Sequence, residues 1–74
     1  MDSLDAVERL LRDRGRTQDA ASVAGRAAQA TTDRDEAVAL WLWLADLNPP
    51  EGAVSEWDQA VAGYLEEMRR LHQR

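Results

Sequence analysis

The sequence predicts an all-α protein, a small three- or four-helix bundle. Apolar residues recur at intervals of three and four in separate segments, which is the spacing of one face of a helix. Gly15 and the pair Pro49-Pro50 separate these segments, as residues that end helices do. With 74 residues, the chain is expected to form a single helical domain over residues 1–74.

The first helix is expected over residues 3–14. Leu4, Val7, Leu10 and Leu11 recur at helical spacing and form its apolar stripe. Gly15 follows, and a glycine there readily adopts the left-handed conformation that commonly closes a helix. The segment therefore has both a face to bury and a defined end.

A second, thinner helix is expected over residues 18–31, with Thr17 as its N-cap. Its apolar residues are almost all alanine, and Gly25 in its interior costs about 1 kcal/mol relative to alanine. That cost is offset if a bulky neighbour needs the space. We therefore expect Gly25 and Ala28 to lie in close contact with the tryptophans of the next helix, where enlarging Ala28 to leucine would overpack the contact.

The third helix, expected over residues 33–47, is the most informative segment. Thr32 or Asp33 is placed to start it, and Asp33 with Glu36 is close to a capping box. Pro49 and Pro50 prevent the helix from continuing. Residues 37–45 are apolar around the whole circumference of a helix, so other groups must cover every side. The face expected in the core comprises Ala37, Leu40, Trp41, Leu44 and Leu47. Val38, Leu42 and Ala45 lie across from this face, and Trp43 lies at the edge of the face expected in the core.

The fourth helix is expected over residues 53–72. Its apolar residues alternate spacings of three and four, the heptad pattern of packed helices. The pattern is shorter than the three or four heptads of a typical coiled coil, so packing in a bundle is favoured over a free coiled coil. The stripe comprises Val54, Trp57, Val61, Tyr64, Met68 and Leu71, and Leu65 widens it.

Surplus apolar surface on the third helix predicts association with another protein chain. A domain of this size buries only about 60% of the surface that its unfolded chain exposes. The sequence has no cysteine for a disulfide and one histidine, so a homo-oligomer or a protein partner is the remaining source of stability. The expected interface residues are Val38, Leu42, Trp43, Trp57, Tyr64 and Met68. The fourth helix could pack on its own chain or on the other one.

The net charge of −5 is concentrated in one stretch. Residues 33–58 hold seven acidic residues against Arg34, whereas the rest of the chain is close to neutral. Asp35, Glu36 and Asp46 are expected to stay exposed as an acidic docking patch for a partner with a basic surface. The alternative is that these acids only keep an apolar-rich domain in solution.

Residues 21–49 resemble the helix–turn–helix of a single tetratricopeptide repeat. Gly25 stands in the first helix, Ala37 and Trp41 form the Ala-x-x-x-aromatic pattern of the second, and Pro49 closes the segment. The first-helix positions that usually hold larger side chains hold alanines, and one repeat is visible. The resemblance implies protein binding. The alternative is a helical hairpin that shares only this pattern.

Residues that carry catalysis are sparse, so we expect no enzymatic activity, no cofactor and no metal site. His72 is the one histidine, and Ser3, Ser22 and Ser55 have no base expected nearby. The acids in the first turn of the third helix complement the helix dipole, which explains them without a metal.

The alternative function class is a DNA-associated transcriptional regulator of the helix-turn-helix type. Four arginines occur between residues 9 and 16, but a pI of about 4.6 opposes binding to phosphates. The apolar third helix also lacks the polar side chains that read base edges. Nucleic-acid binding is therefore not expected. It would be favoured if one face of the protein gathered Arg9, Arg12, Arg16 and Arg26.

Composition also bears on origin and location. All nine basic residues are arginine, and lysine, isoleucine and phenylalanine are absent, which indicates a GC-rich bacterial genome. The longest apolar run has nine residues, far below the ~20 of a membrane-spanning helix, and the acidic residues near Met1 differ from a secretory signal. We therefore expect a protein that does not contact the membrane, and the absence of cysteine favours a cytoplasmic location.

Overall fold

The computed structural model describes residues 2–73, which form four α-helices and no strand. The helices are α1 (Asp2–Asp13), α2 (Thr17–Thr32), α3 (Arg34–Asp46) and α4 (Val54–Leu71). Each end lies one residue from its predicted position. The predicted all-α bundle is confirmed. Within the described residues, no helix combines the length and apolar character that crossing a membrane requires.

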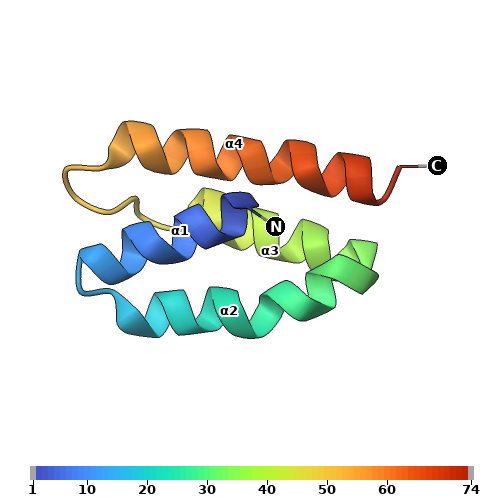
Figure 1. Cartoon of the computed structure of the whole chain (residues 1–74), viewed down its shortest axis with the longest axis horizontal. Coiled ribbons are helices and arrows are strands. Elements are labelled where there is room, and N and C mark those ends of the chain that lie inside the picture. Colours follow the sequence, from blue (N-terminus) through green and yellow to red (C-terminus); the bar gives the residue numbers. More distant parts are fainter. Residues whose placement is uncertain (1, 74) are drawn as a thin grey trace.

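The chain runs up and down through the four helices (Figure 1). In this view α4 lies along the top and α2 along the bottom, with α1 in front of α3 between them. α1 and α3 each pack against both α2 and α4. Every helix therefore turns one face to the core and another to the solvent.

Buried side chains from all four helices form one core cluster. On α3 the buried residues are Ala37, Leu40 and Leu44, flanked by the half-buried Trp41 and Leu47. This is the face that helical periodicity assigns to the core, so that prediction is confirmed. The other helices contribute Leu4, Val7, Leu11, Ala20, Val23, Ala30, Trp57, Ala60, Tyr64 and Met68.

Two short connections hold the first three helices in place. Gly15 has a φ of +76°, the left-handed conformation predicted at the end of α1. Asp33 alone separates α2 from α3, and its side chain accepts a hydrogen bond from the backbone N–H of Asp35 at 2.9 Å. Asp33 is thus the N-cap of α3, as predicted. A connection of one residue leaves little freedom between α2 and α3.

The third connection, residues 47–53, is longer but anchored. Pro50 and Ala53 are buried, and the N–H of Ala53 donates to the carbonyl oxygen of Pro50 at 3.1 Å. Gly52 lies inside this turn with a φ of +82°, a backbone conformation that residues other than glycine rarely adopt. The turn therefore fixes the chain shortly before α4 begins.

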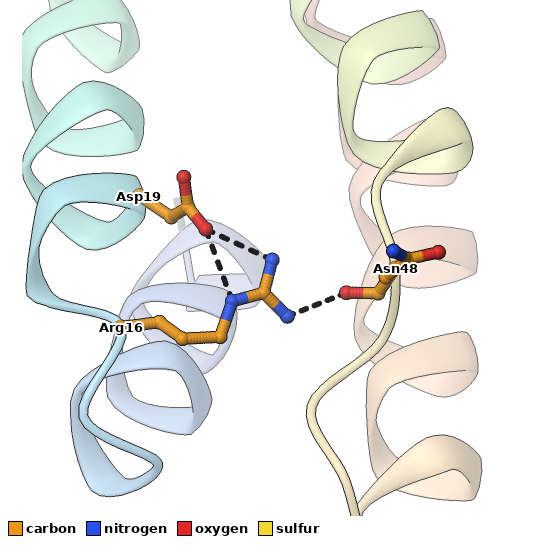
Figure 2. Close-up of polar contacts among 3 residues, drawn as sticks. All are labelled: Arg16, Asp19 and Asn48. Atoms are coloured by element: carbon orange, nitrogen blue, oxygen red, sulfur yellow. Dashed lines mark hydrogen bonds and ion pairs between the residues drawn. The ribbon is translucent and has the colours of Figure 1, made fainter.

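Arg16 ties two connections together at one end of the bundle (Figure 2). Its Nε and Nη2 donate to the same carboxylate oxygen of Asp19 at 3.0 and 2.9 Å, and its Nη1 donates to the carbonyl oxygen of Asn48. The expectation that Thr17 caps α2 is wrong, because Thr17 is the first residue of the helix and Arg16 occupies the N-cap position. The Arg16–Asp19 pair stabilises this first turn instead.

The side of α2 that carries Gly25 and Ala28 faces the solvent rather than the tryptophans. Gly25 and Ala28 are exposed, and a Cβ built on Gly25 would meet nothing within 4 Å. The buried face of α2 comprises Ala20, Val23 and Ala30. The expected close contact of Gly25 and Ala28 with the tryptophans is therefore wrong. Alanines occur on every side of this helix, so their spacing does not show which side faces inward.

α4 packs on its own chain. Tyr64 is fully buried, and its hydroxyl donates to the carbonyl oxygen of Ala37 at 3.3 Å, which joins α4 to α3. Burial raises the pKa of the Tyr64 phenol, while the charge of Arg26 lowers it and that of Glu67 raises it to smaller extents. The folded protein therefore favours the neutral phenol.

We expect this tyrosine to make the protein less stable at alkaline pH. The folded-state pKa of Tyr64 lies above the unfolded value of about 10. Its contribution to stability is complete below pH ~10 and is lost as the pH rises through the folded-state pKa. Urea denaturation should therefore show that the stability difference between wild type and Tyr64→Phe narrows above pH ~10. A constant difference from neutral to strongly alkaline pH would contradict this assignment.

Candidate protein-interaction surface

The outward face of α3 is apolar along its middle. Leu42 lies at the centre of this face and is 54% exposed. Ala39 and Ala45 are exposed beside it, and Val38, one turn earlier, is half-buried. We call these four residues the α3 outer face. Leu42 and Ala45 are exposed, as predicted for the side opposite the core, whereas Val38 is partly buried against the core cluster.

The two tryptophans of α3 flank the outer face on opposite sides, because residues two apart lie about 200° apart around a helix. Trp43 faces α2, where the guanidinium carbon of Arg26 lies 5.7 Å from the centre of its ring. The indole N–H of Trp41, on the side of α4, is buried without a hydrogen-bond partner in the described part of the chain. Both side chains are half-buried. Trp43 is among the expected interface residues, but it lies at the rim of the outer face rather than at its centre.

Three residues that the sequence assigns to the interface belong to the core instead. Trp57, Tyr64 and Met68 are 3%, 0% and 6% exposed and lie in the core cluster of their own chain. Heptad spacing occurs both in helices that pack on their own chain and in helices that bind another chain. The sequence alone therefore did not show which of these α4 does. The structure corrects these three assignments, and the surface candidates that remain are on α3.

An open groove of about 770 Å³ lies between the start of α3 and the end of α4. Arg34 and Val38 line it from α3, Met68 and Arg69 line it from α4, and His72 lines it just after the end of α4. The sequence did not predict this groove, because it depends on how α3 and α4 lie against each other.

The apolar side of this groove continues along α4. Leu65 and Val61 precede Arg69 by one and two turns, so they lie on the same side of the helix, and both are half-buried. The opposite side of α4 faces α1, where Ser3 approaches Gly63 and Glu67. We call the surface formed by Val38, Leu42, Ala45, Val61 and Leu65 the α3–α4 seam.

The predicted acidic patch is divided rather than continuous. Asp35 and Asp46 are exposed, whereas Glu36 is half-buried. Asp35 and Asp46 lie on the same side of α3 but are three turns apart, about 16 Å along the axis. They therefore flank the two ends of the α3 outer face, with the apolar residues between them.

Two side chains that could carry chemistry instead join helices. Ser3 donates hydrogen bonds from its hydroxyl and its backbone N–H to the carboxylate of Glu67. The Nε2 of His72 lies 3.0 Å from the carbonyl oxygen of Ala30, which links the end of α4 to the end of α2. Among residues 2–73, no three histidine, cysteine, aspartate or glutamate side chains gather as metal ligands.

The arginines that a DNA-binding face would gather lie on different sides of the bundle. Arg9 lines the groove between α1 and α4, whereas Arg26 lies over Trp43 between α2 and α3. Arg12 pairs with a glutamate of its own helix, and Arg16 ties the two connections at one end. Because the α1–α4 and α2–α3 sides are opposite each other, these four arginines do not converge.

Comparison of the chain with protein-family models, with curated proteins and with solved structures finds no match. The function proposed for this chain therefore rests on the geometry of the α3 outer face.

Proposed function

We propose that this domain is a protein–protein interaction module that binds through the α3 outer face. It associates with a second copy of itself or serves as an adaptor or regulatory partner of another protein. The observation that carries this proposal is Leu42, 54% exposed at the centre of an apolar face. Fully burying a leucine side chain gains about 1.5–3 kcal/mol, so covering this face with another protein is favourable.

Two further features support the proposal. The resemblance of residues 21–49 to a tetratricopeptide helix–turn–helix implies protein binding. Asp35 and Asp46, at the two ends of the outer face, suit a partner with basic groups, because complementary charge accelerates association and selects partners. Keeping the domain in solution is the alternative role of these acids. The proposal also holds that the protein is bacterial and cytoplasmic, and that it has neither enzymatic activity nor a cofactor.

Leu42→Glu should reduce association, because an interface that buries a carboxylate without a partner is strongly disfavoured. The substitution is at an exposed position, so we expect the fold to persist. Ala28→Glu is the matched control, since it places the same charge at an exposed position of α2. Light scattering after gel filtration should give a mass above that of the monomer for wild type and Ala28→Glu, and a lower mass for Leu42→Glu.

A wild-type monomer at high micromolar concentration would exclude self-association and leave the hetero-partner. Affinity capture with wild type, Leu42→Glu and Ala28→Glu as baits then tests that case. A specific partner should be lost with Leu42→Glu alone. If Leu42→Glu retains every partner, the α3 outer face is not the binding surface.

A further inference from the structure

Exposed apolar side chains lie along the α3–α4 seam as far as one end of the bundle. Leu42 on α3 and Val54 on α4 are 54% and 51% exposed, more than any other large apolar side chain of residues 2–73. Val54 precedes Val61 by seven residues, or two turns, so both lie on the same side of α4. Because α3 and α4 run in opposite directions, the end of α3 lies beside the start of α4 (Figure 1). Val54 therefore extends the apolar surface of the seam towards the end of α3.

Four exposed acidic residues surround this end of the seam. They are Asp46, Glu51, Glu56 and Asp58. The turn between α1 and α2 brings arginines to the same end but no excess of positive charge, because Arg16 is paired with Asp19 and Arg14 follows Asp13 in the chain. Arg9 shares a groove with Glu56 and offsets one of the four charges. This end of the seam is therefore clearly acidic.

The other end of the seam is net negative as well, though less strongly. Three arginines lie there, namely Arg34, Arg69 and Arg70. Neighbouring acidic residues outnumber them, and these are Asp33, Asp35, Glu36, Glu66 and Glu67. Arg26, the one basic residue of α2, does not reverse this balance. Neither end of the seam therefore offers a basic surface.

This charge distribution favours a basic partner over a second copy of the chain. Whichever way a second copy is turned, a net negative end of one seam meets a net negative end of the other, and like charges across an interface disfavour association. A partner with basic residues before and after an apolar stripe would pair with both ends and cover Leu42 between them. Complementary charge also accelerates the encounter and selects the partner.

The form of the surface favours a helix as the part of the partner that binds. Residues 2–73 contain no strand, so they offer no sheet edge to which an extended segment could add. The exposed apolar residues instead follow a single straight helix. On either side of Leu42, Ala39 and Ala45 are exposed and small, which allows another helix to approach closely. A helix bound in this way contacts the surface through apolar residues three and four positions apart.

We propose that the α3 outer face and the α3–α4 seam dock an amphipathic helix of another protein, with basic residues at both ends of its apolar stripe, in preference to a second copy of this chain. This inference rests on the proposed function and names the class of partner. Leu42 contacts the middle of the apolar stripe, and Asp46 and Asp58 pair with the basic residues at one end. Self-association through Leu42 is then the weaker of the two interactions.

Synthetic helical peptides test the charge and the apolar spacing of the partner. The lysine peptide has about 18 residues, a helix ~27 Å long, with leucines at spacings of three and four and lysines before and after them. One control peptide has glutamates in place of the lysines, and the other has the same composition with its leucines spread around the helix. Fluorescence anisotropy at low salt should show that the lysine peptide binds about tenfold more tightly than either control. Added salt should reduce its advantage over the glutamate peptide.

Variants of the protein separate the acidic residues from the apolar face. Asp46→Asn with Asp58→Asn should weaken binding of the lysine peptide about fivefold, because exposed ion pairs are lost. Asp5→Asn with Asp13→Asn is the matched control, since it removes the same charge from exposed positions near the two ends of α1. Leu42→Gln removes the apolar contact without a change in charge, so it should weaken peptide binding and self-association alike. Circular dichroism checks that each variant is folded.

Three results would overturn the basic helix as the preferred partner. They are a control peptide that binds as tightly as the lysine peptide, an unchanged affinity after Asp46→Asn with Asp58→Asn, and self-association of wild type that is tighter than binding of the lysine peptide. In each case, loss of self-association with Leu42→Gln would still support the proposed function. The proposed function fails instead if Leu42→Gln changes neither peptide binding nor self-association.

Discussion

Leu40→Ala should lower the free energy of unfolding by about 2–5 kcal/mol, the usual cost of leaving a cavity in place of a buried leucine. Leu40 is 0% exposed and lies in the core cluster. Domains are stable by only about 0.05–0.15 kcal/mol per residue, so for a chain of 74 residues this loss is a large part of the total. Urea denaturation followed by circular dichroism measures the change. If Leu40→Ala does not fold, Leu40→Met, which keeps the volume, should cost less than about 1.5 kcal/mol.

Leu42→Ala is the matched control for this prediction. It makes the same chemical change two residues later on α3, at a side chain that is 54% exposed. At concentrations where the protein is a monomer, we expect an effect within about 0.5 kcal/mol. Equal costs at Leu40 and Leu42 would show that the orientation of α3 in the structure is wrong.

Alanine substitutions at Gly25 and Gly63 should change stability in opposite directions. Gly25 is exposed and has open space around it, so Gly25→Ala should stabilise the protein by about 1 kcal/mol through helix propensity alone. At Gly63, a new Cβ would lie 2.6 Å from the Oγ of Ser3. The Ser3 hydroxyl would have to leave the carboxylate of Glu67, and a hydrogen bond to a charged group is worth about 1.5–3 kcal/mol. Gly63→Ala should therefore destabilise the protein by about 1 kcal/mol.

The Ser3→Ala background separates this steric effect from helix propensity. Without the Oγ, the nearest atom to the new Cβ is the Cβ of Ser3 at 3.6 Å, an ordinary contact distance. Gly63→Ala should then stabilise the protein relative to Ser3→Ala. Thermal melting of wild type, Gly63→Ala, Ser3→Ala and the double variant gives the coupling free energy between positions 3 and 63. If Gly63→Ala raises the melting temperature of wild type as much as Gly25→Ala does, α1 and α4 do not meet as closely as the structure shows.

The helices and the inner face of α3 could be predicted from sequence because local signals determine them. The Gly15 C-cap, the Asp33 N-cap and the proline pair act within one turn of chain, and all three place helix ends correctly to one residue. The two faces of α3 follow from periodicity, because Asp35 and Asp46 lie on the side of the helix opposite Leu40 and Leu44 and so indicate which side faces the solvent.

The remaining features depend on contacts between helices, which spacing does not encode. α2 is uniformly small, so its rotation about its own axis is set by neighbours, and Gly25 faces the solvent as a result. Trp57 and Met68 would show the same spacing whether α4 bound its own chain or another. The groove beside Val38 forms only where α3 and α4 lie side by side.

The anchored connections have a consequence for the cost of binding. Asp33 joins α2 to α3 by itself, and Arg16 holds the turn after α1 against Asn48. The backbone that carries the α3 outer face is therefore already ordered before another protein arrives. Disordered segments lose conformational entropy when they fold on binding, whereas this surface would lose mainly the freedom of two rigid bodies and of side chains such as Leu42. A small apolar area can then suffice for specific association.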